Sequence, residues 1–256
     1  MKSLRFRPTW LAAAIGFVAL AAPLSAHADP NKLWQIVHDQ CVPHERAKGD
    51  PSPCLAVHLK AGYAVLKDNT GATQVLVIPT AKVTGIEDPK VLAASAPNYY
   101  AFAWTARSYV DGFAKQTIPR DELMLAVNSI DGRTQNQLHI HVDCINVAVR
   151  TALAANLASI GATWAPIDLG IQGRHYEAMR LTGDDLAGRN PFKLLADGDP
   201  AAKADMSLET LVVAPVTLPD GKPGFILLAD RAVPPGDDGS GEELQDHDCG
   251  VLKSGG

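Results

Sequence analysis

Polar and apolar residues alternate without a break from Gln137 to Asp143. On a β-strand, successive side chains point to opposite faces, so the apolar residues would face a core. The other face would carry Gln137, His139, His141 and Asp143. Two imidazoles roughly 7 Å apart on a rigid strand suit a phosphate chain. One can attack phosphorus while the other holds or protonates a neighbouring oxygen. The alternative is an ordinary half-exposed strand that carries two histidines and does no chemistry.

The rest of the pattern predicts an α+β fold, an antiparallel sheet with packed helices. Apolar alternation and turn residues indicate strands at 55–59, 63–66, 74–79, 123–127, 164–169, 175–181, 211–218 and 224–228. Helical spacing indicates helices at 31–40, 88–116, 147–160 and 190–196, the last one capped by Thr182–Asp185. The first three strands would form an antiparallel meander. The second half echoes the first, which favours a degenerate internal repeat.

Length and composition bound the class of protein. The 256 residues are 46% hydrophobic and 20% charged, an ordinary globular balance. The formal net charge of −5 argues against nucleic acid as a partner, because a broad nucleic-acid surface needs a basic face. A local pocket for one nucleotide is compatible with that charge. We expect one folded domain from residue 29 to residue 256.

The first 28 residues have the features of an export signal. A basic stretch, Met1–Arg7, precedes the apolar run Trp10–Ala22, and Ala26–Ala28 forms an Ala-x-Ala cleavage site. No formal charge lies between Arg7 and Asp29, a gap long enough for an uncleaved membrane anchor. The sequence therefore predicts a body on the periplasmic face of a bacterial inner membrane, anchored there, or a periplasmic protein if the signal is cleaved.

An exported protein meets an oxidising compartment, so its four cysteines are candidates for disulfide bonds. Four cysteines allow three pairings. Cys41 and Cys54 flank a turn-rich segment that a disulfide would staple, which leaves Cys144 to meet Cys249. That second bridge would pin a Gly- and Asp-rich tail at 234–241. Metal ligation is the weaker reading, because no CxxC or HxxxH spacing is present. We expect neither a metal nor a cofactor.

Three strands, a helix, a strand, a polar loop and the histidine strand follow one another along the first half. This order resembles the histidine-triad (HIT) fold of nucleotidyl hydrolases and transferases. In that family a His-x-His-x-His strand carries the nucleophile at its middle histidine. Aligning the motif places Gln137 first, His139 second and His141 third. Gln74 stands where the family usually has a histidine before its Leu-Val-Ile-Pro strand. Both departures remove the outer hydrogen-bond partners of the common branch.

These departures fit a divergent branch, and the chain resembles the exported CDP-diacylglycerol pyrophosphatases. Besides the motif Gln-Leu-His-Ile-His-Val-Asp, the opening Leu33-Trp-Gln-Ile-Val, the Cys-Val-Pro segment, the N-terminal signal and the full length agree. The resemblance covers roughly Leu33 to the C-terminus and is most specific from Asn128 to Cys144. It implies one HIT-like domain whose partners are CDP-diacylglycerol and the inner-membrane surface.

The resemblance also implies a mechanism without metal. His139 Nε2 would attack the phosphorus that bears cytidine, displacing phosphatidate and leaving a CMP-histidine intermediate that water releases. His141 would donate hydrogen bonds to the phosphoryl oxygens. A carbonyl group or Asp143 would hold the His139 tautomer. The flanking substrate contacts are assigned to Asn128, Arg133, Thr134, Gln137, Gln74 and Asp143.

Two other functions stay open from the sequence. A non-catalytic periplasmic nucleotide-binding module is motivated by the missing first histidine, although a pure binder would not need His139. A hydrolase of a soluble nucleotide pyrophosphate keeps the chemistry and changes the substrate. His58, Lys60 and Arg174 are weighed as basic groups at the pocket edge against ordinary surface positions. No role is assigned to three further histidines, His38, His44 and His247.

Overall fold

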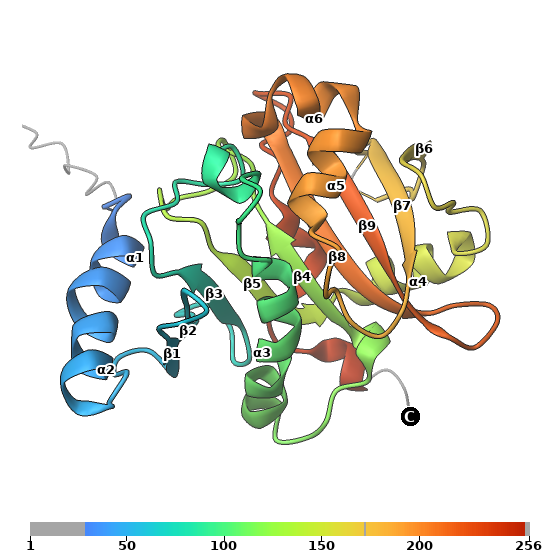
Figure 1. Cartoon of the computed structure of the whole chain (residues 1–256). Helices are drawn as coiled ribbons and strands as arrows, with labels where there is room; N and C mark the ends of the chain where they lie inside the picture. Colours follow the sequence, from blue (N-terminus) through green and yellow to red (C-terminus); the bar gives the residue numbers. More distant parts are fainter. Residues whose placement is uncertain (1–28, 172, 254–256) are drawn as a thin grey trace, which may run out of the picture.

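The computed structural model describes residues 29–171 and 173–253, so the predicted signal or anchor at 1–28 lies outside the described residues. Within them, helices pack on one antiparallel sheet of ten strands, which confirms the α+β class (Figure 1). The strands are β1 (Ala56–His58), β2 (Tyr63–Lys67), β3 (Val75–Pro79), β4 (Leu123–Val127), β5 (Ile140–Ile145), β6 (Ala165–Ile167), β7 (Tyr176–Thr182), β8 (Glu209–Thr217), β9 (Pro223–Arg231) and β10 (Gln245–Asp246).

Most of the helices are short. The α-helices are α1 (Lys32–Gln35), α2 (Val42–Lys48), α3 (Tyr99–Ala114), α4 (Val147–Asn156), α5 (Pro191–Gly198) and α6 (Pro200–Ala204). A π-helical turn, Ile36–Cys41, joins α1 to α2. Short 3-10 turns span Pro89–Val91, Arg120–Glu122, Met206–Leu208, Gly241–Leu244 and Gly250–Lys253.

The strand order places β5 in the interior of the sheet. Along the sheet the order is β1-β2-β3-β5-β4-β8-β9-β7-β6, and all neighbours are antiparallel. The expected meander β1–β3 and the hairpin β8–β9 are therefore confirmed. On one side β5 pairs with β4. On its other side β3 and β10 lie end to end, β3 against Ile140–Val142 and β10 against Cys144 and Ile145.

The two halves of the sheet share one order of elements. β2, β3, α3, β4 and β5 follow one another, and so do β6, β7, α5, β8 and β9. In each half the last strand is inserted between the second and the third. The halves meet where β4 pairs antiparallel with β8, Ala126 opposite Val212.

Helices α3 and α5 cover one face of the sheet (Figure 1). The side chain of Asn98 caps α3 by accepting from the backbone N–H of Ala101. The ring of Tyr100 is fully buried and lies 5.0 Å from that of Phe192 on α5. Trp104 packs edge-on against Phe225 of β9. The apolar face of the predicted long helix is therefore core.

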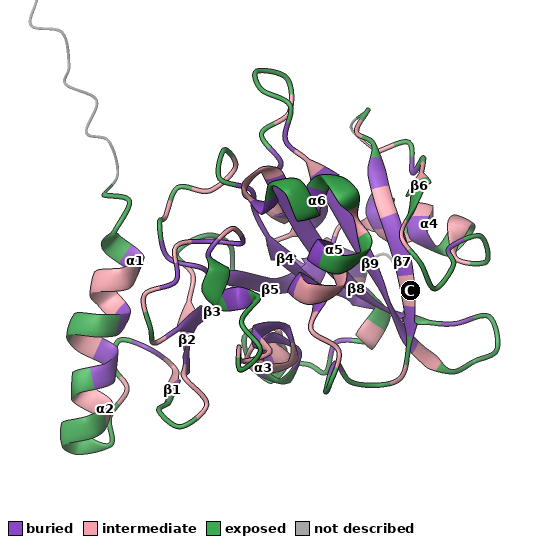
Figure 2. Ribbon diagram, turned by 45° about the horizontal axis from the view of Figure 1, so that its top comes forward, coloured by how far each residue is buried: buried purple, intermediate pink, exposed green. Residues whose placement is uncertain are grey.

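The N-terminal helix covers the opposite face of β2 and β3. Leu33, Val37 and Cys41 are buried against Leu76 and Ile78 in a second apolar cluster, while the outer side of the helix is exposed (Figure 2). The helix continues beyond residue 40, so the prediction of a turn-rich segment at 42–48 was wrong. The π-helical turn precedes the proline of α2, which lacks a backbone N–H to donate back along an α-helix.

Both disulfides form as expected, Cys41–Cys54 and Cys144–Cys249. The first ties the N-terminal helix to the entry of β1, and the second ties β5 to the C-terminal segment. The cap predicted at Thr182–Asp185 was wrong, because Asn190 accepts from the N–H of Phe192 at the start of α5. No helix among residues 29–171 and 173–253 has the length and apolar character to cross a bilayer.

Candidate functional site

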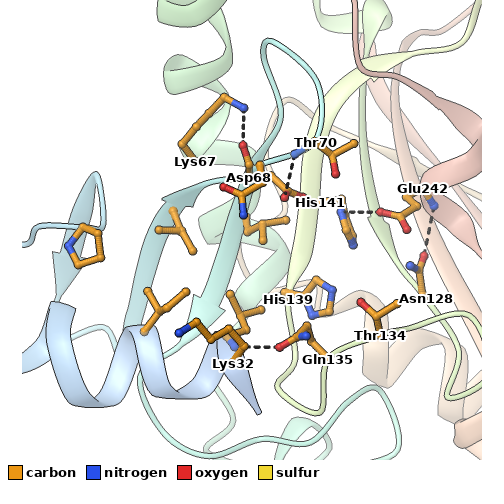
Figure 3. A pocket seen from close by; sticks show the side chains of 16 residues that line it. Lys32, Lys67, Asp68, Thr70, Asn128, Thr134, Gln135, His139, His141 and Glu242 are labelled. Atoms are coloured by element: carbon orange, nitrogen blue, oxygen red, sulfur yellow. Dashed lines mark hydrogen bonds and ion pairs between the residues drawn. The ribbon is translucent and has the colours of Figure 1, made fainter. Parts of the chain in front are cut away.

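A pocket of about 640 Å³ lies where the histidine strand meets the N-terminal helix and the C-terminal segment. Figure 3 shows His139 and His141 between the β2–β3 loop on one side and Asn128, Thr134 and Glu242 on the other. The pocket is lined by Lys32, Leu33, Ile36, Pro53, Leu66, Lys67, Asp68, Asn69, Thr70, Leu76, Asn128, Thr134, Gln135, His139, His141 and Glu242.

The polar face of the histidine strand is covered, and not half-exposed as in the alternative without chemistry. His139 is 9% exposed and His141 4%, while Gln137 and Asp143 have no exposed surface. The reason is that the N-terminal helix and the C-terminal segment both lie over this face, and neither segment shows in the alternation of the strand itself. The two histidines therefore reach solvent only through the pocket.

His139 is held in one tautomer by its own strand. Its Nδ1 lies 2.7 Å from the carbonyl oxygen of Gln137, and a carbonyl can only accept, so Nδ1 carries the proton. Nε2 is then the basic nitrogen. Burial, and secondarily the neighbouring His141, lowers the pKa of His139 to about 4. The ring is therefore neutral at neutral pH, the state that a nitrogen nucleophile requires.

His141 lies beside it, with its ring centroid 4.8 Å from that of His139. Its Nδ1 is 3.0 Å from Oε2 of Glu242, a close charge contact without the alignment of a hydrogen bond. Burial lowers the pKa of His141 to about 4, with Asp68 opposing and His247 reinforcing that shift. Neither ring nitrogen makes a hydrogen bond with the described part of the chain. Both nitrogens are buried and Nδ1 faces Glu242, so Nε2 is the nitrogen that a ligand would have to satisfy.

Asn128 and Thr134 line the pocket as residues from the predicted loop. The side-chain oxygen of Asn128 accepts from the backbone N–H groups of Gly241 and Glu242, at 2.9 and 3.2 Å. Its amide nitrogen is 3.4 Å from the carbonyl oxygen of Gly132. Asn128 thus fixes the segment that presents Glu242 to His141.

Arg133 is not among the residues that line the pocket, so the geometry lends its expected phosphate contact no support. Its guanidinium makes two hydrogen bonds to the carboxylate of Glu87, at 2.6 and 2.7 Å, and its side chain is 4% exposed. A fork-to-carboxylate pair of this geometry satisfies both charges within the protein. Arg133 therefore anchors the loop to residue 87.

Three further residues with expected substrate contacts are also absent from the lining, Gln137, Gln74 and Asp143, and those contacts stay predictions. The amide nitrogen of Gln137 donates to the carbonyl oxygens of Pro79 and Ala81, which fastens the end of β3. Gln74 is fully buried, and its amide nitrogen lies 3.2 Å from His247 Nδ1. Asp143 accepts from Thr73, so these residues build the site from behind.

The sequence reading missed the cationic side of the pocket. Lys32 comes from the first turn of the N-terminal helix and Lys67 from the end of β2. Lys67 Nζ donates to the carbonyl oxygens of Asp68 and Gly71, at 2.7 and 3.1 Å. Neither lysine belongs to a motif, and only the fold brings them beside the histidines. The same holds for Glu242.

Three residues weighed as pocket groups lie elsewhere. His58 stacks on Tyr63 with a ring-centroid distance of 4.4 Å, and it and Lys60 are exposed at β1. Arg174 makes ion pairs with Asp230 and Glu243 in a separate hollow. The surface reading was therefore right for the first two, and Arg174 is a structural cation.

One group of possible metal ligands comes together among the described residues: Asp143, Cys144 and Cys249. The two sulfur atoms are bonded to each other, so neither is a thiolate ligand. The carboxylate is engaged by Thr73 and His247. This cluster is therefore a structural element beside the pocket.

A buried neutral imidazole with a basic Nε2, a second imidazole and two lysines in one pocket suit an enzyme of phosphoryl chemistry. The sequence profile of the CDP-diacylglycerol pyrophosphatase family matches residues 28–253. A Yersinia pestis protein named CDP-diacylglycerol pyrophosphatase is 44% identical over 226 residues, which are 88% of this chain and 86% of that protein. The chain therefore belongs to the CDP-diacylglycerol pyrophosphatase family, and it is a hydrolase.

Proposed function

We propose that this chain hydrolyses the pyrophosphate bond of CDP-diacylglycerol, giving CMP and phosphatidate through a CMP-histidine intermediate. The observation that carries the proposal is the tautomer of His139. Because Nδ1 donates to the Gln137 carbonyl oxygen, the lone pair of Nε2 is on the nitrogen that a substrate in the pocket can meet. The lowered pKa keeps that nitrogen unprotonated at neutral pH.

In the first step, Nε2 of His139 attacks the phosphorus that bears cytidine. A nitrogen–phosphorus bond forms, and the bond from that phosphorus to the bridging oxygen breaks, so phosphatidate leaves with the bridging oxygen. In the second step, water attacks the same phosphorus and the nitrogen–phosphorus bond breaks, which releases CMP. Two displacements of this kind replace one difficult displacement.

The other pocket groups stabilise the charge of the diphosphate. Lys32 and Lys67 supply positive charge at the rim. The negative phosphates favour a protonated His141, because an opposite charge nearby raises the pKa of an imidazole. Its Nδ1–H then meets Glu242, and its Nε2–H donates to a phosphoryl oxygen. No step of this scheme runs through a metal.

The apolar side of the pocket suits the glycerol end of the lipid. Leu33 and Ile36 come from the N-terminal helix, and Leu66 and Leu76 come from β2 and β3. The helix follows directly on residues 1–28, whose pattern predicts a signal or anchor. We therefore propose that the enzyme acts at the periplasmic face of the inner membrane, in phospholipid metabolism.

The test is CMP release from CDP-diacylglycerol in mixed micelles by residues 29–256 in H₂¹⁸O. Wild type is compared with His139→Ala and with His38→Ala, a surface control. The two-step scheme requires ¹⁸O in CMP and none in phosphatidate, and the His139 variant should lose at least about a thousandfold in rate. Acid quenching must be avoided, because the nitrogen–phosphorus bond of a phosphohistidine hydrolyses in acid and survives in base. Alkaline quenching with substrate that carries ³²P at the phosphorus bearing cytidine should trap labelled wild type only.

Other outcomes select the alternatives. ¹⁸O in phosphatidate would place the attack on the other phosphorus and remove the CMP-histidine. A folded wild type that binds CDP without turnover would leave the nucleotide-binding module. Equal turnover of CDP-diacylglycerol and of a soluble CDP ester would favour the soluble nucleotide pyrophosphate as substrate.

The proposal extends to the fold, as a HIT-like unit followed by a degenerate copy. The two halves meet at the pair Ala126–Val212, which we take as the centre of the repeat. Ala126 also pairs with His141, and Val212 also pairs with Leu228. The position of His141 on β5 therefore corresponds to Leu228 on β9. Two residues earlier, His139 corresponds to Ile226. Leu228 and Ile226 are buried, so the second half has no histidine pair. Calorimetry should find one CMP bound per chain, and two would contradict this assignment.

A further inference from the structure

A third histidine reaches the back of the site from the C-terminal segment. Nδ1 of His247 lies 2.9 Å from Oδ2 of Asp143, whose other oxygen accepts from Thr73 Oγ1 at 2.6 Å. Asp143 has no exposed surface, whereas 27% of the His247 side chain is exposed. Asp143 is two residues beyond His141 on the same strand face, and the charge of His247 acts on His141, lowering its pKa.

The position of His247 is fixed from several sides. The disulfide Cys144–Cys249 joins its segment to the residue after Asp143. The backbone carbonyl oxygen of His247 accepts from the N–H of Ala72 at 3.1 Å. A Cβ atom at Gly71 would lie 2.4 Å from Cβ of His247, so the β2–β3 loop can approach only because residue 71 is glycine. The contact with Asp143 is therefore built, not incidental.

Charge explains what this contact does. A carboxylate without a partner in the interior is costly and attracts protons to neighbouring groups. The groups that face His247 are Asp143, Glu242, Asp68 and the imidazole of His141. The hydrogen bond to Asp143 is the main reason that the pKa of His247 is raised. A protonated His247 cancels the charge of Asp143.

Two acidic neighbours in the same segment do not take part. The Asp246 carboxylate accepts from the backbone N–H groups of Asp248 and Gly250, and Asp248 is exposed. His247 is therefore the cation that compensates the charge of Asp143.

We propose that His247 is a positioning residue of the active site. It neutralises Asp143, so that His141 can interact with Glu242 and the substrate without competition from that carboxylate. Without His247, the carboxylate of Asp143 would be unpaired two residues from His141. It would compete with Glu242 for the protonated His141 ring, and its charge would raise the pKa of both imidazoles in the substrate complex. This inference rests on the proposed function, since it assigns a role within the same reaction.

The test is a double-variant cycle on CMP release, followed as kcat and KM from pH 4.5 to 8.5. His247→Gln should lower kcat about tenfold with little change in KM, and should move the acid limb of the kcat profile to higher pH. Asp143→Asn combined with His247→Gln removes the unpaired charge. This double variant should recover most of kcat, and the acid limb of its kcat profile should return to the wild-type position. His38→Gln, which removes an exposed histidine paired with Asp39, is the matched control.

A purely structural role predicts the opposite order, with the double variant worse than His247→Gln and the acid limb unmoved. That result would overturn the inference, and so would unchanged kinetics in His247→Gln. Thermal unfolding of each variant shows whether lost activity is lost fold; if His247→Gln does not fold, His247→Lys, which keeps a cation, is compared with the double variant. An inactive wild type would instead remove the proposed function.

Discussion

Oε2 of Glu242 lies 3.0 Å from Nδ1 of His141, so the C-terminal segment supplies an acidic partner to the second histidine of β5. Burial raises the pKa of Glu242, while the neighbouring His139 opposes that shift. Burial thus disfavours the charged form of both groups. A negatively charged substrate can then favour the protonated form of His141.

Substituting this acid should slow turnover. Glu242→Gln keeps the size of the side chain but removes the charge that accepts from a protonated His141, so kcat should fall about tenfold with a smaller change in KM. Calorimetry of CDP binding in two buffers of different ionisation enthalpy should show proton uptake by wild type and less by the variant. Equal uptake in both proteins would contradict the pairing of His141 with Glu242.

Asn128 should matter through Glu242. Asn128→Ala removes the oxygen that accepts from Gly241 and Glu242, so kcat should fall about tenfold or more, because the acid loses its fixed position. Asn128→Asp retains acceptor oxygens and should keep the segment in place, while its negative charge beside the phosphates raises KM. Steady-state kinetics of both variants separate these effects. A fall in kcat of the same size in both would show that the amide nitrogen, not the oxygen, is what matters.

Arg133 should contribute to stability and not to substrate affinity. Arg133→Met leaves Glu87 without its partner, and breaking such a partly buried pair costs about 2–4 kcal/mol of unfolding free energy. KM should stay within about twofold, because the guanidinium does not reach the pocket. Urea unfolding and kinetics measure the two effects. The matched double variant, Arg133→Met with Glu87→Gln, should be less destabilised than Arg133→Met. A large rise in KM in Arg133→Met would instead support a contact between Arg133 and the phosphates.

The two buried imidazoles should make the fold acid-sensitive. The pKa values of His139 and His141 are near 4 in the folded state, below the ordinary 6.5. Between those values the unfolded chain binds more protons, so their contribution to stability is complete above pH 6.5 and is lost as pH falls towards 4. Between pH 7 and pH 5 the free energy of unfolding should therefore fall by about 1–2 kcal/mol less in His141→Gln than in wild type.

Urea unfolding of both proteins at the two pH values measures that difference. Burial raises the pKa of Glu209 to about 7 and that of Asp230 to about 6, so these acids stabilise the fold as pH falls. Both proteins contain them, and the comparison cancels their effect. Parallel loss in wild type and variant would mean that His141 is protonated in the folded state.

The fold was predictable where the signal was local. β3 and β4 are apolar on both faces and bounded by turn residues, and β8 and β9 flank an Asp-Gly turn, so each was found near its observed ends. The helix at 32–48 was cut short in the prediction because Pro43 ordinarily interrupts an α-helix, and the π-helical turn that precedes it has no sequence signature.

The site was predictable only along its own strand. His139 and His141 follow from alternation and spacing, and Asn128 and Thr134 from the resemblance of the preceding loop. Glu242 and His247 come from a segment rich in glycine and aspartate, which carries no periodicity to place it. Their partners are set by the pairing of β10 with β5, a long-range contact that local patterns do not encode.

The walls of the pocket come from opposite ends of the folded chain: Lys32 and Leu33 from its beginning, Glu242 from its end. During synthesis the two histidines are therefore made long before the acid that serves them. A chain that ends before Glu242 therefore lacks one wall of the pocket. The pocket is complete only once the closing segment is in place, held to β5 by the disulfide Cys144–Cys249.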